Sequence, residues 1–264
     1  NGKKIKILSL SNNPSVASKN VYILGTTFET IADRLIKYSL NRDLRKFAVV
    51  GPEGDIGFEA IDAVRRSVAK NGGTITTVMT YPLSINGIKE SAESIYQEIV
   101  DNDSQAIIFT DTPTRGLGFI SEQIKTNFLE NKKVPVRFLG LTRWDKTRQA
   151  LKEPSLQSGW FVVPDQRFIK EYELRFSKAF GMMPSEMSTL SYDAIALVGG
   201  LIKRAKTTMS SEPFDNSNLI NKNGFVGING VFRFNSAGIN ERMLSIVEVR
   251  NGTFSVLDSA KSSF

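Results

Sequence analysis

Short apolar runs alternate with amphipathic stretches through the middle of the chain. The apolar runs are bounded by turn residues and predict five strands, at residues 47–50, 74–81, 105–110, 134–141 and 159–163. Apolar residues at helical spacing predict helices between them, at residues 58–69, 88–100 and 117–129. Strands that alternate with single helices form right-handed crossovers. This region is therefore predicted to fold as an α/β lobe with a parallel sheet.

The pattern is different on either side of this region. A strand and a helix are predicted before it, at residues 4–10 and 30–40, and two consecutive helices after it, at 167–180 and 188–205. A polar surface loop at 207–218 and strands at 230–234, 243–249 and 253–257 complete the chain, and Asn251-Gly252 predicts a hairpin between the last two. The flanking elements need a second sheet to pack on.

Three segments follow from this division. Residues 1–45 are predicted to be the remnant of an N-terminal lobe, 46–164 the second α/β lobe, and 165–264 the return to the N-terminal lobe with the C-terminal strands. The flanking segments contain too few predicted strands to form a complete second sheet. We therefore expect part of the first lobe to be missing upstream of Asn1.

The composition excludes several kinds of chemistry. The 264 residues include no Cys and no His, so thiolate catalysis, disulfides, thiol-based metal sites and histidine general bases are impossible. No G-x-S-x-G motif is present. Acidic residues follow several strands, but spacing alone does not pair them, and hydrolysis is the weakest alternative. We predict no catalytic residue, no metal site and no cofactor.

The charge and the glycines change this picture little. The net charge is +7, but Lys and Arg are spread along the chain, which indicates a solvated basic surface and no nucleic-acid partner. The turn Gly51–Gly57 has the spacing G-x-x-G-x-x-G, which matches neither nucleotide-binding motif. A phosphate cradle remains an alternative, but tight turning at the edge of a cleft is the favoured interpretation.

Candidate ligand contacts lie where parallel strands end, because ligands bind outside the carboxyl ends of such sheets. Arg115 and Arg143 would supply positive charge for a carboxylate or phosphate, and Trp144 an apolar wall, although Trp144 could equally pack on the following helix. The serines near residue 10 suit a small zwitterion, or simply make a turn. The predicted contacts are Ser9, Ser11, Asn12, Thr26 and Thr27 on one side, and Asp55, Ile56, Asp111, Thr112, Arg115, Arg143 and Trp144 on the other. Tyr192 and Asp193 lie within a helical pattern and are expected to be structural.

Several segments together resemble the type I periplasmic-binding fold of the leucine/isoleucine/valine-binding class. They are the strand at 4–10 with its serines, residues 46–57, Ala179-Phe180-Gly181 with Leu190-Ser191-Tyr192-Asp193-Ala194, and residues 223–234. The resemblance implies a two-lobed α/β protein with parallel doubly wound sheets that binds ligands in the periplasm and is not an enzyme. One alternative it implies is the solute-binding component of an ABC importer for amino acids or related small polar ligands.

Other details resemble one branch of this family more closely, the penicillin-binding-protein activators of Gram-negative bacteria. Trp144-Asp145, residues 153–161 and residues 223–234 carry this likeness. In addition, Ile56 stands where amino-acid binders typically have Tyr. The likeness implies an outer-membrane lipoprotein, with a lipid anchor upstream of Asn1, that regulates a peptidoglycan synthase. This is the favoured hypothesis, with a small polar ligand such as an amino acid or peptide as the alternative partner.

Overall fold

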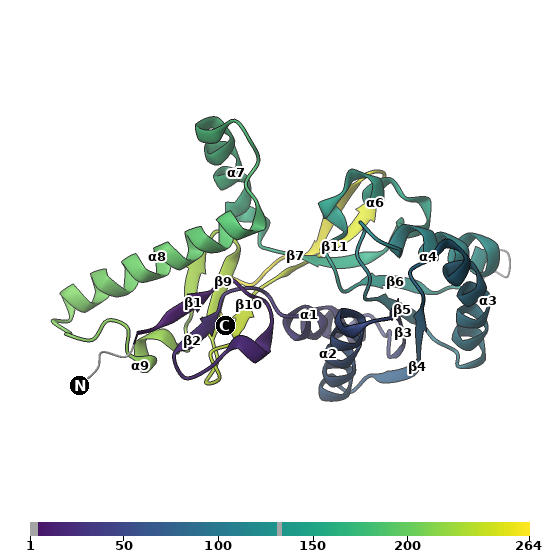
Figure 1. Ribbon diagram of the computed structural model, residues 1–264, viewed down its shortest axis with the longest axis horizontal. Helices are drawn as coiled ribbons and strands as arrows, with labels where there is room; N and C mark the ends of the chain where they lie inside the picture. Colours follow the sequence, from purple (N-terminus) through teal and green to yellow (C-terminus); the bar gives the residue numbers. More distant parts are fainter. Residues whose placement is uncertain (1–4, 131–133) are drawn as a thin grey trace. The chain divides into compact units, whose positions relative to one another are not determined.

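The computed structural model describes residues 5–130 and 134–264, and the chain divides into two compact units (Figure 1). Unit 1 comprises the residues up to Thr30, Pro164–Ser245 and Ser259–Phe264, and unit 2 comprises Ile31–Val163 and Ile246–Asp258. Lys4, the first residue of the strand predicted at 4–10, lies outside the described residues.

Unit 2 is built on a mostly parallel sheet, as predicted. Among the described residues the sheet has seven strands, in the order β12-β11-β7-β6-β5-β3-β4. The pairs β3–β4, β3–β5, β5–β6 and β6–β7 are all parallel. The bounds are β3 (Lys46–Pro52), β4 (Thr74–Tyr81), β5 (Ala106–Phe109), β6 (Arg137–Gly140), β7 (Trp160–Val163), β11 (Ser245–Arg250) and β12 (Thr253–Asp258).

The last two strands form the hairpin that Asn251-Gly252 predicts. They pair antiparallel, and both turn residues have positive φ, 49° and 80°. The hairpin extends the sheet of unit 2 beside β7, so residues 246–258 do not lie with the first lobe, where the sequence pattern had placed them. A two-stranded hairpin needs a sheet or helix to cover its apolar face, and β7 offers a partner edge.

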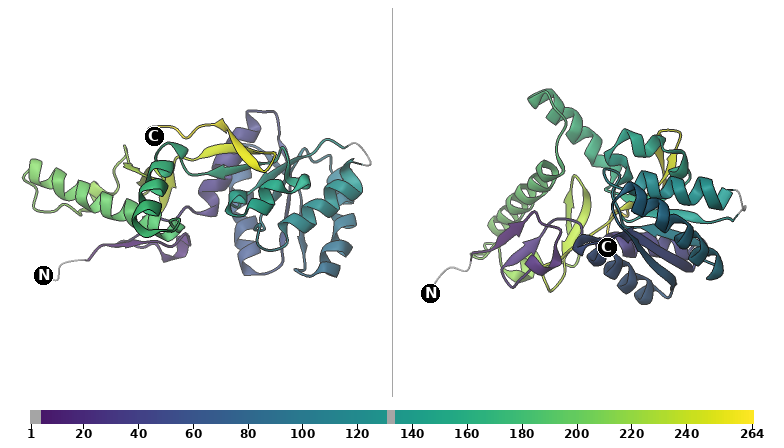
Figure 2. Two further views of the ribbon diagram at one scale, coloured as in Figure 1. Left: turned by 90° about the horizontal axis from the view of Figure 1, so that it is seen from above. Right: turned by 45° about the vertical axis from the view of Figure 1, so that its right-hand side comes forward.

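Helices cover both faces of this sheet. The crossover β3–α2–β4 runs toward the edge, whereas β4–α3–β5 runs back, so right-handed connections put α2 and α3 on opposite faces. Figure 2 shows α3 and α4 side by side. The central strands β3, β5 and β7 are buried almost throughout, as two-sided cover requires. The bounds are α1 (Phe28–Leu40), α2 (Asp55–Asn71), α3 (Ile85–Asp101), α4 (Leu117–Ile124) and α6 (Arg148–Lys152); α4 continues as a π-helical turn at Lys125–Leu129.

Unit 1 has two small sheets and a pair of long helices. Strands β1 (Ile7–Ser9) and β2 (Val21–Ile23) pair in parallel, and β8 (Phe225–Gly227), β9 (Gly230–Phe234) and β10 (Asn240–Arg242) form an antiparallel sheet in the order β10-β9-β8. Strands β2, β8 and β10 were not predicted, because three residues carry too little periodicity to show. The helices are α7 (Gln166–Phe180), α8 (Glu186–Thr207) and the short α9 (Asn216–Leu219), which begins inside the loop predicted at 207–218. No helix of the described residues is both long and apolar enough to span a membrane.

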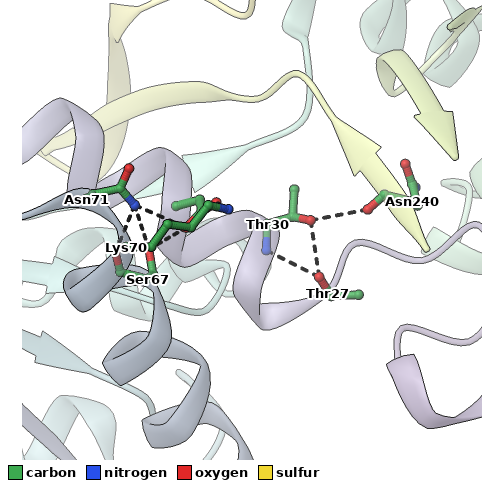
Figure 3. A network of polar contacts seen from close by, with 7 residues as sticks. Thr27, Thr30, Ser67, Lys70, Asn71 and Asn240 are labelled. Atoms are coloured by element: carbon green, nitrogen blue, oxygen red, sulfur yellow. Dashed lines mark hydrogen bonds and ion pairs between the residues drawn. The ribbon is translucent and has the colours of Figure 1, made fainter. Parts of the chain in front are cut away.

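Asp33 explains why α1 lies in unit 2, although the sequence pattern assigned residues 31–45 to the first lobe. Its carboxylate accepts hydrogen bonds from Ser67 Oγ at 2.7 Å, Lys70 Nζ at 2.5 Å and Asn71 Nδ2 at 3.2 Å. Figure 3 shows these three donors together on α2. Burial raises the pKa of Asp33, but the hydrogen bonds from Lys70 and Ser67 outweigh it and leave the pKa below its ordinary value. Asp33 therefore stabilises the contact of α1 with α2 in its charged form.

A buried ion pair joins α8 to the antiparallel sheet within unit 1. Arg242 donates to Asp193 Oδ2 at 3.0 Å, and both side chains are at most 1% exposed. Asp193 also accepts from Ile228 N at 2.7 Å and from Asn229 Nδ2 at 3.1 Å. Burial lowers the pKa of Arg242 and the neighbouring Asp193 carboxylate opposes this, but a guanidinium stays charged in proteins. Asp193 is thus a structural residue, as its place in the helical pattern indicates.

Substitution of Arg242 by Met should destabilise the protein strongly. The change would leave the Asp193 carboxylate buried without its cation, which costs about 3–5 kcal/mol of unfolding free energy. Arg233→Met is the matched control, since Arg233 pairs with Glu241 near the surface and should lose less than about 1 kcal/mol. Urea unfolding measures both. Equal losses for the two variants would contradict the role given to the buried pair.

Substitution of Asp33 by Asn should lower stability in a pH-dependent way. At pH 7 we expect a loss of about 1–2 kcal/mol, because charge-assisted hydrogen bonds from Ser67 and Lys70 weaken. The pKa of Asp33 is lower in the folded state, so its contribution is present above the unfolded pKa and disappears as pH falls through the folded one. The gap between wild type and variant should close below about pH 4. Asp62→Asn, which breaks only an exposed pair with Arg65, should change little at any pH; a constant gap for Asp33→Asn would show the prediction to be wrong.

Candidate functional site

Three loops of unit 2 come together at the carboxyl-end edge of its sheet. In the parallel register Pro52 pairs with Tyr81, Val50 with Phe109, and Phe109 with Gly140. The loops that follow β3, β5 and β6 therefore start at the same level. The predicted contacts at 55–56, 111–115 and 143–144 all belong to these loops. The sheet brings them to one edge, as the topology predicts.

Asp111 fixes the loop after β5. Its carboxylate accepts hydrogen bonds from the Tyr81 hydroxyl at 2.7 Å, the Gly116 N–H at 2.8 Å and the Thr112 N–H at 2.7 Å, and it is only 1% exposed. Thr142 Oγ1 also donates to the backbone oxygen of Asp111 at 2.7 Å and ties in the next loop. Asp111 was predicted to contact ligand. With three donors on a buried carboxylate, it holds the loop in place instead.

Tyr81 is a permanent donor in this arrangement. Burial, together with the adjacent Asp111 carboxylate, raises the pKa of its hydroxyl far above the ordinary value of 10.0. The hydroxyl therefore stays protonated at any physiological pH. The contact gives a rigid loop and supplies no proton for chemistry.

The rest of this loop faces solvent. Thr112 is half-buried, and its hydroxyl lies 3.2 Å from that of the exposed Thr114. The side chain of Arg115 is exposed and makes no ion pair with any residue that the structure describes. Thr112 and Arg115 are therefore accessible, and their role in ligand binding stays a prediction.

Arg143 and Trp144 were predicted to contact a ligand, but both interact with other parts of the protein. Arg143 binds Asp145 through two hydrogen bonds, of 2.6 and 2.5 Å, which neutralise its charge locally. Trp144 is fully buried in the core of unit 2 and stacks on Phe161, with 5.7 Å between the ring centroids. The indole fills space left open at Gly140, where a Cβ atom would lie 2.4 Å from it. Trp144 therefore packs in the core against Gly140, Gly159 and Phe161 and forms no wall for a ligand.

The glycines at the end of β3 and in the turn after it are required by the backbone conformation and by close packing. Gly54 has φ = 110°, a conformation that side chains rarely allow, and a Cβ at Gly51 would lie 2.1 Å from Thr110 Oγ1. These demands account for the glycines without a phosphate. The tight turn exposes Asp55 and Ile56 on the first turn of α2, where a ligand could reach both.

The polar turn of unit 1 satisfies much of its hydrogen bonding internally. Ser9 Oγ accepts from Ser11 N at 3.3 Å, and Ser11 Oγ accepts from Asn13 N at 3.0 Å. Thr27 is buried, and its hydroxyl accepts from the Thr30 N–H at 3.2 Å, which caps α1 (Figure 3). These contacts match the turn-forming alternative for Ser9 and Ser11, and Thr27, which was predicted to contact a ligand, caps a helix instead.

Two predicted contacts of this turn stay at the surface. Asn12 is exposed and Thr26 is half-buried. A hydrogen bond from Gly25 N to Ser11 O, 3.1 Å long, brings their two segments together. Asn12 and Thr26 are thus the members of this group that a ligand could reach.

A pocket in unit 2 at the start of α3 and α4 was not predicted from the sequence. It measures about 680 Å³ and is lined by Leu83, Ser84, Ile85, Ile88, Lys89, Arg115, Gly116 and Phe119. The one available signal was Leu83-Ser84-Ile85, in which two apolar residues flank a helix-capping serine. Among the described residues, no cluster of acidic side chains could hold a metal ion.

Comparison with known proteins identifies the family. A family model described as periplasmic binding protein matches residues 2–253. A search of curated proteins finds no match. Several solved structures share the fold at low sequence identity.

The leucine-binding protein LivK of Thermotoga maritima is 14% identical, with a TM-score of 0.65, over 98% of this chain and 73% of that one. A substrate-binding protein of Desulfitobacterium hafniense, solved in complex with Leu, is 16% identical with a TM-score of 0.66, over 92% and 69%. A solute-binding protein of R. palustris, solved in complex with 4-hydroxybenzoate, is 15% identical with a TM-score of 0.67, over 99% and 72%. At this identity the likeness establishes the fold, and the family model, which spans most of the sequence, establishes that the chain belongs to the periplasmic binding protein family.

Proposed function

We propose that the chain is the solute-binding component of an ABC importer and takes a small organic acid or amino acid. The observation that carries the proposal is the family match over residues 2–253. It is supported by the loop after β5 at the carboxyl-end edge of the sheet, which buried hydrogen bonds to Asp111 hold in place while its other side chains stay accessible. The family implies an extracytoplasmic location and binding without catalysis. Two of the three similar structures named above were solved with Leu and with 4-hydroxybenzoate, both of which carry a carboxylate.

The proposed ligand contacts are the predicted residues that remain accessible. In unit 2 they are Asp55 and Ile56 on the first turn of α2 and Thr112 and Arg115 after β5; in unit 1, taken by itself, they are Asn12 and Thr26. An exposed carboxylate suits an amino group, and a guanidinium and hydroxyl and amide groups suit a carboxylate. The residues of unit 2 alone support a zwitterion or a hydroxylated acid.

The regulator of a peptidoglycan synthase, favoured by the sequence alone, has less support. The residues that carry that resemblance are mainly core residues: Trp144, Leu156 and Phe161 are fully buried. They account for the packing of unit 2 and present no surface to a partner protein. The synthase partner and the tether to the outer membrane stay predictions that rest on the resemblance. Recovery of a synthase in a pull-down, with no binding of small ligands, would favour them.

Substitution of Thr112 by Val should weaken ligand binding. Calorimetry against leucine and other amino acids is expected to give saturable heat for at least one compound. Thr112→Val should then lower the affinity about tenfold, because a buried polar group of the ligand loses its partner. Thr74→Val is the matched control, since Thr74 is exposed at the amino end of β4, and it should leave the affinity unchanged. No heat with any amino acid would argue against a solute-binding role.

A further inference from the structure

The pocket at the start of α3 and α4 lies wholly within unit 2 and has the dimensions of a small-molecule site. Its volume of about 680 Å³ falls within the range of about 300–1,000 Å³ that is usual for ligand pockets. Unlike the proposed contacts at Asp55 and Thr112, it is lined by the segment that follows β4 and by the first turns of two neighbouring helices.

The lining is apolar over most of its extent. Ile88 is buried and forms part of the floor, and Phe119 is half-buried beside it. Leu83, just before the N-cap of α3, and Ile85, on its first turn, are 42% and 67% exposed, which are large fractions for apolar side chains. Apolar side chains that converge on a cavity favour a ligand with an apolar body.

Two cations stand at this apolar pocket. The side chains of Lys89 and Arg115 are exposed, and neither pairs with an acidic group among the described residues. The nearest buried carboxylate, Asp111, already accepts three hydrogen bonds, which offset its charge. The pocket therefore carries positive charge that no acidic side chain among the described residues neutralises.

Ser84 adds a directed donor to the pocket. Its Oγ accepts the Gly87 N–H at 3.0 Å and caps α3, which leaves the hydroxyl proton to donate elsewhere. The pocket also lies at the N-terminus of α3, where the helix dipole adds to the positive potential. The donors and cations together select an anion.

We propose that this pocket binds a small monocarboxylate with a compact apolar body, an aryl or branched aliphatic acid. The body would lie against Ile88 and Phe119, and the carboxylate would meet Arg115, Lys89 and the Ser84 hydroxyl. A phosphate would leave the apolar lining unused, and a neutral hydrocarbon would leave the two cations unused. The proposal does not depend on the solute-binding role, since the pocket lies in one unit alone and shares only Arg115 with the contacts proposed above.

The test uses benzoate on the full chain, with two matched probes. Benzyl alcohol keeps the ring without the charge, and acetate keeps the charge without the ring. Calorimetry should show that benzoate binds at least about tenfold more tightly than either probe. Only benzoate has both a ring for the apolar lining and a carboxylate for the two cations. Amide chemical shifts of 15N-labelled protein should change at residues 84–89 and 116–119 on addition of benzoate.

Variants tie the binding to the two cations. Arg115→Gln and Lys89→Gln should each weaken benzoate about tenfold, whereas Arg148→Gln, an exposed arginine at the start of α6, should have no effect. Thr112→Val should also leave this binding unchanged, which separates it from the proposed solute site. Absence of benzoate binding, shifts confined to other residues, or equal affinity of the two cation variants and wild type would each overturn the proposal.

Discussion

The hydrogen bonds to the Asp111 carboxylate are the interaction on which the functional edge of unit 2 depends. Three donors converge on this one buried side chain. They are the Tyr81 hydroxyl at the end of β4, the N–H of Thr112, which follows Asp111 in the chain, and the N–H of Gly116 at the start of α4. A buried charge is tolerated only when such donors surround it. The loop after β5 therefore has one well-defined course, and both Thr112 and Arg115 take their positions from it.

The same loop serves two surfaces. Thr112 faces the row of exposed residues along the ends of the strands, while Arg115 lines the pocket between the first turns of α3 and α4. Family membership explains the first surface, because periplasmic binding proteins share this fold. The second surface follows from the side chains of this chain alone. We propose an organic acid for both, and Lys89, which lines the pocket alone, is the residue that would tell them apart.

The sequence predicted the fold of unit 2 well because its signals are local. Apolar runs of four or more residues, the helical spacing between them and the Asn251-Gly252 turn each specify one element. The three-residue strands of unit 1 and the assignment of the final hairpin to unit 2 depend on contacts with distant residues, which no local pattern records. The same limit applies to the site. Topology predicted that residues 55–56, 111–115 and 143–144 lie at one edge, but burial divided them: Trp144 packs in the core opposite Gly140, and Arg143 pairs with Asp145.

The central claim is that Asp111 holds the loop in the form that presents its ligand contacts. Amide hydrogen exchange of the Asp111→Ala variant tests it most directly. Protection of the Gly116 and Thr112 amides should fall by about tenfold or more, because each loses a hydrogen bond to a carboxylate, while Ile107 and Ile108 in the centre of β5 keep their protection. Unchanged protection at Gly116 and Thr112 would contradict the claim.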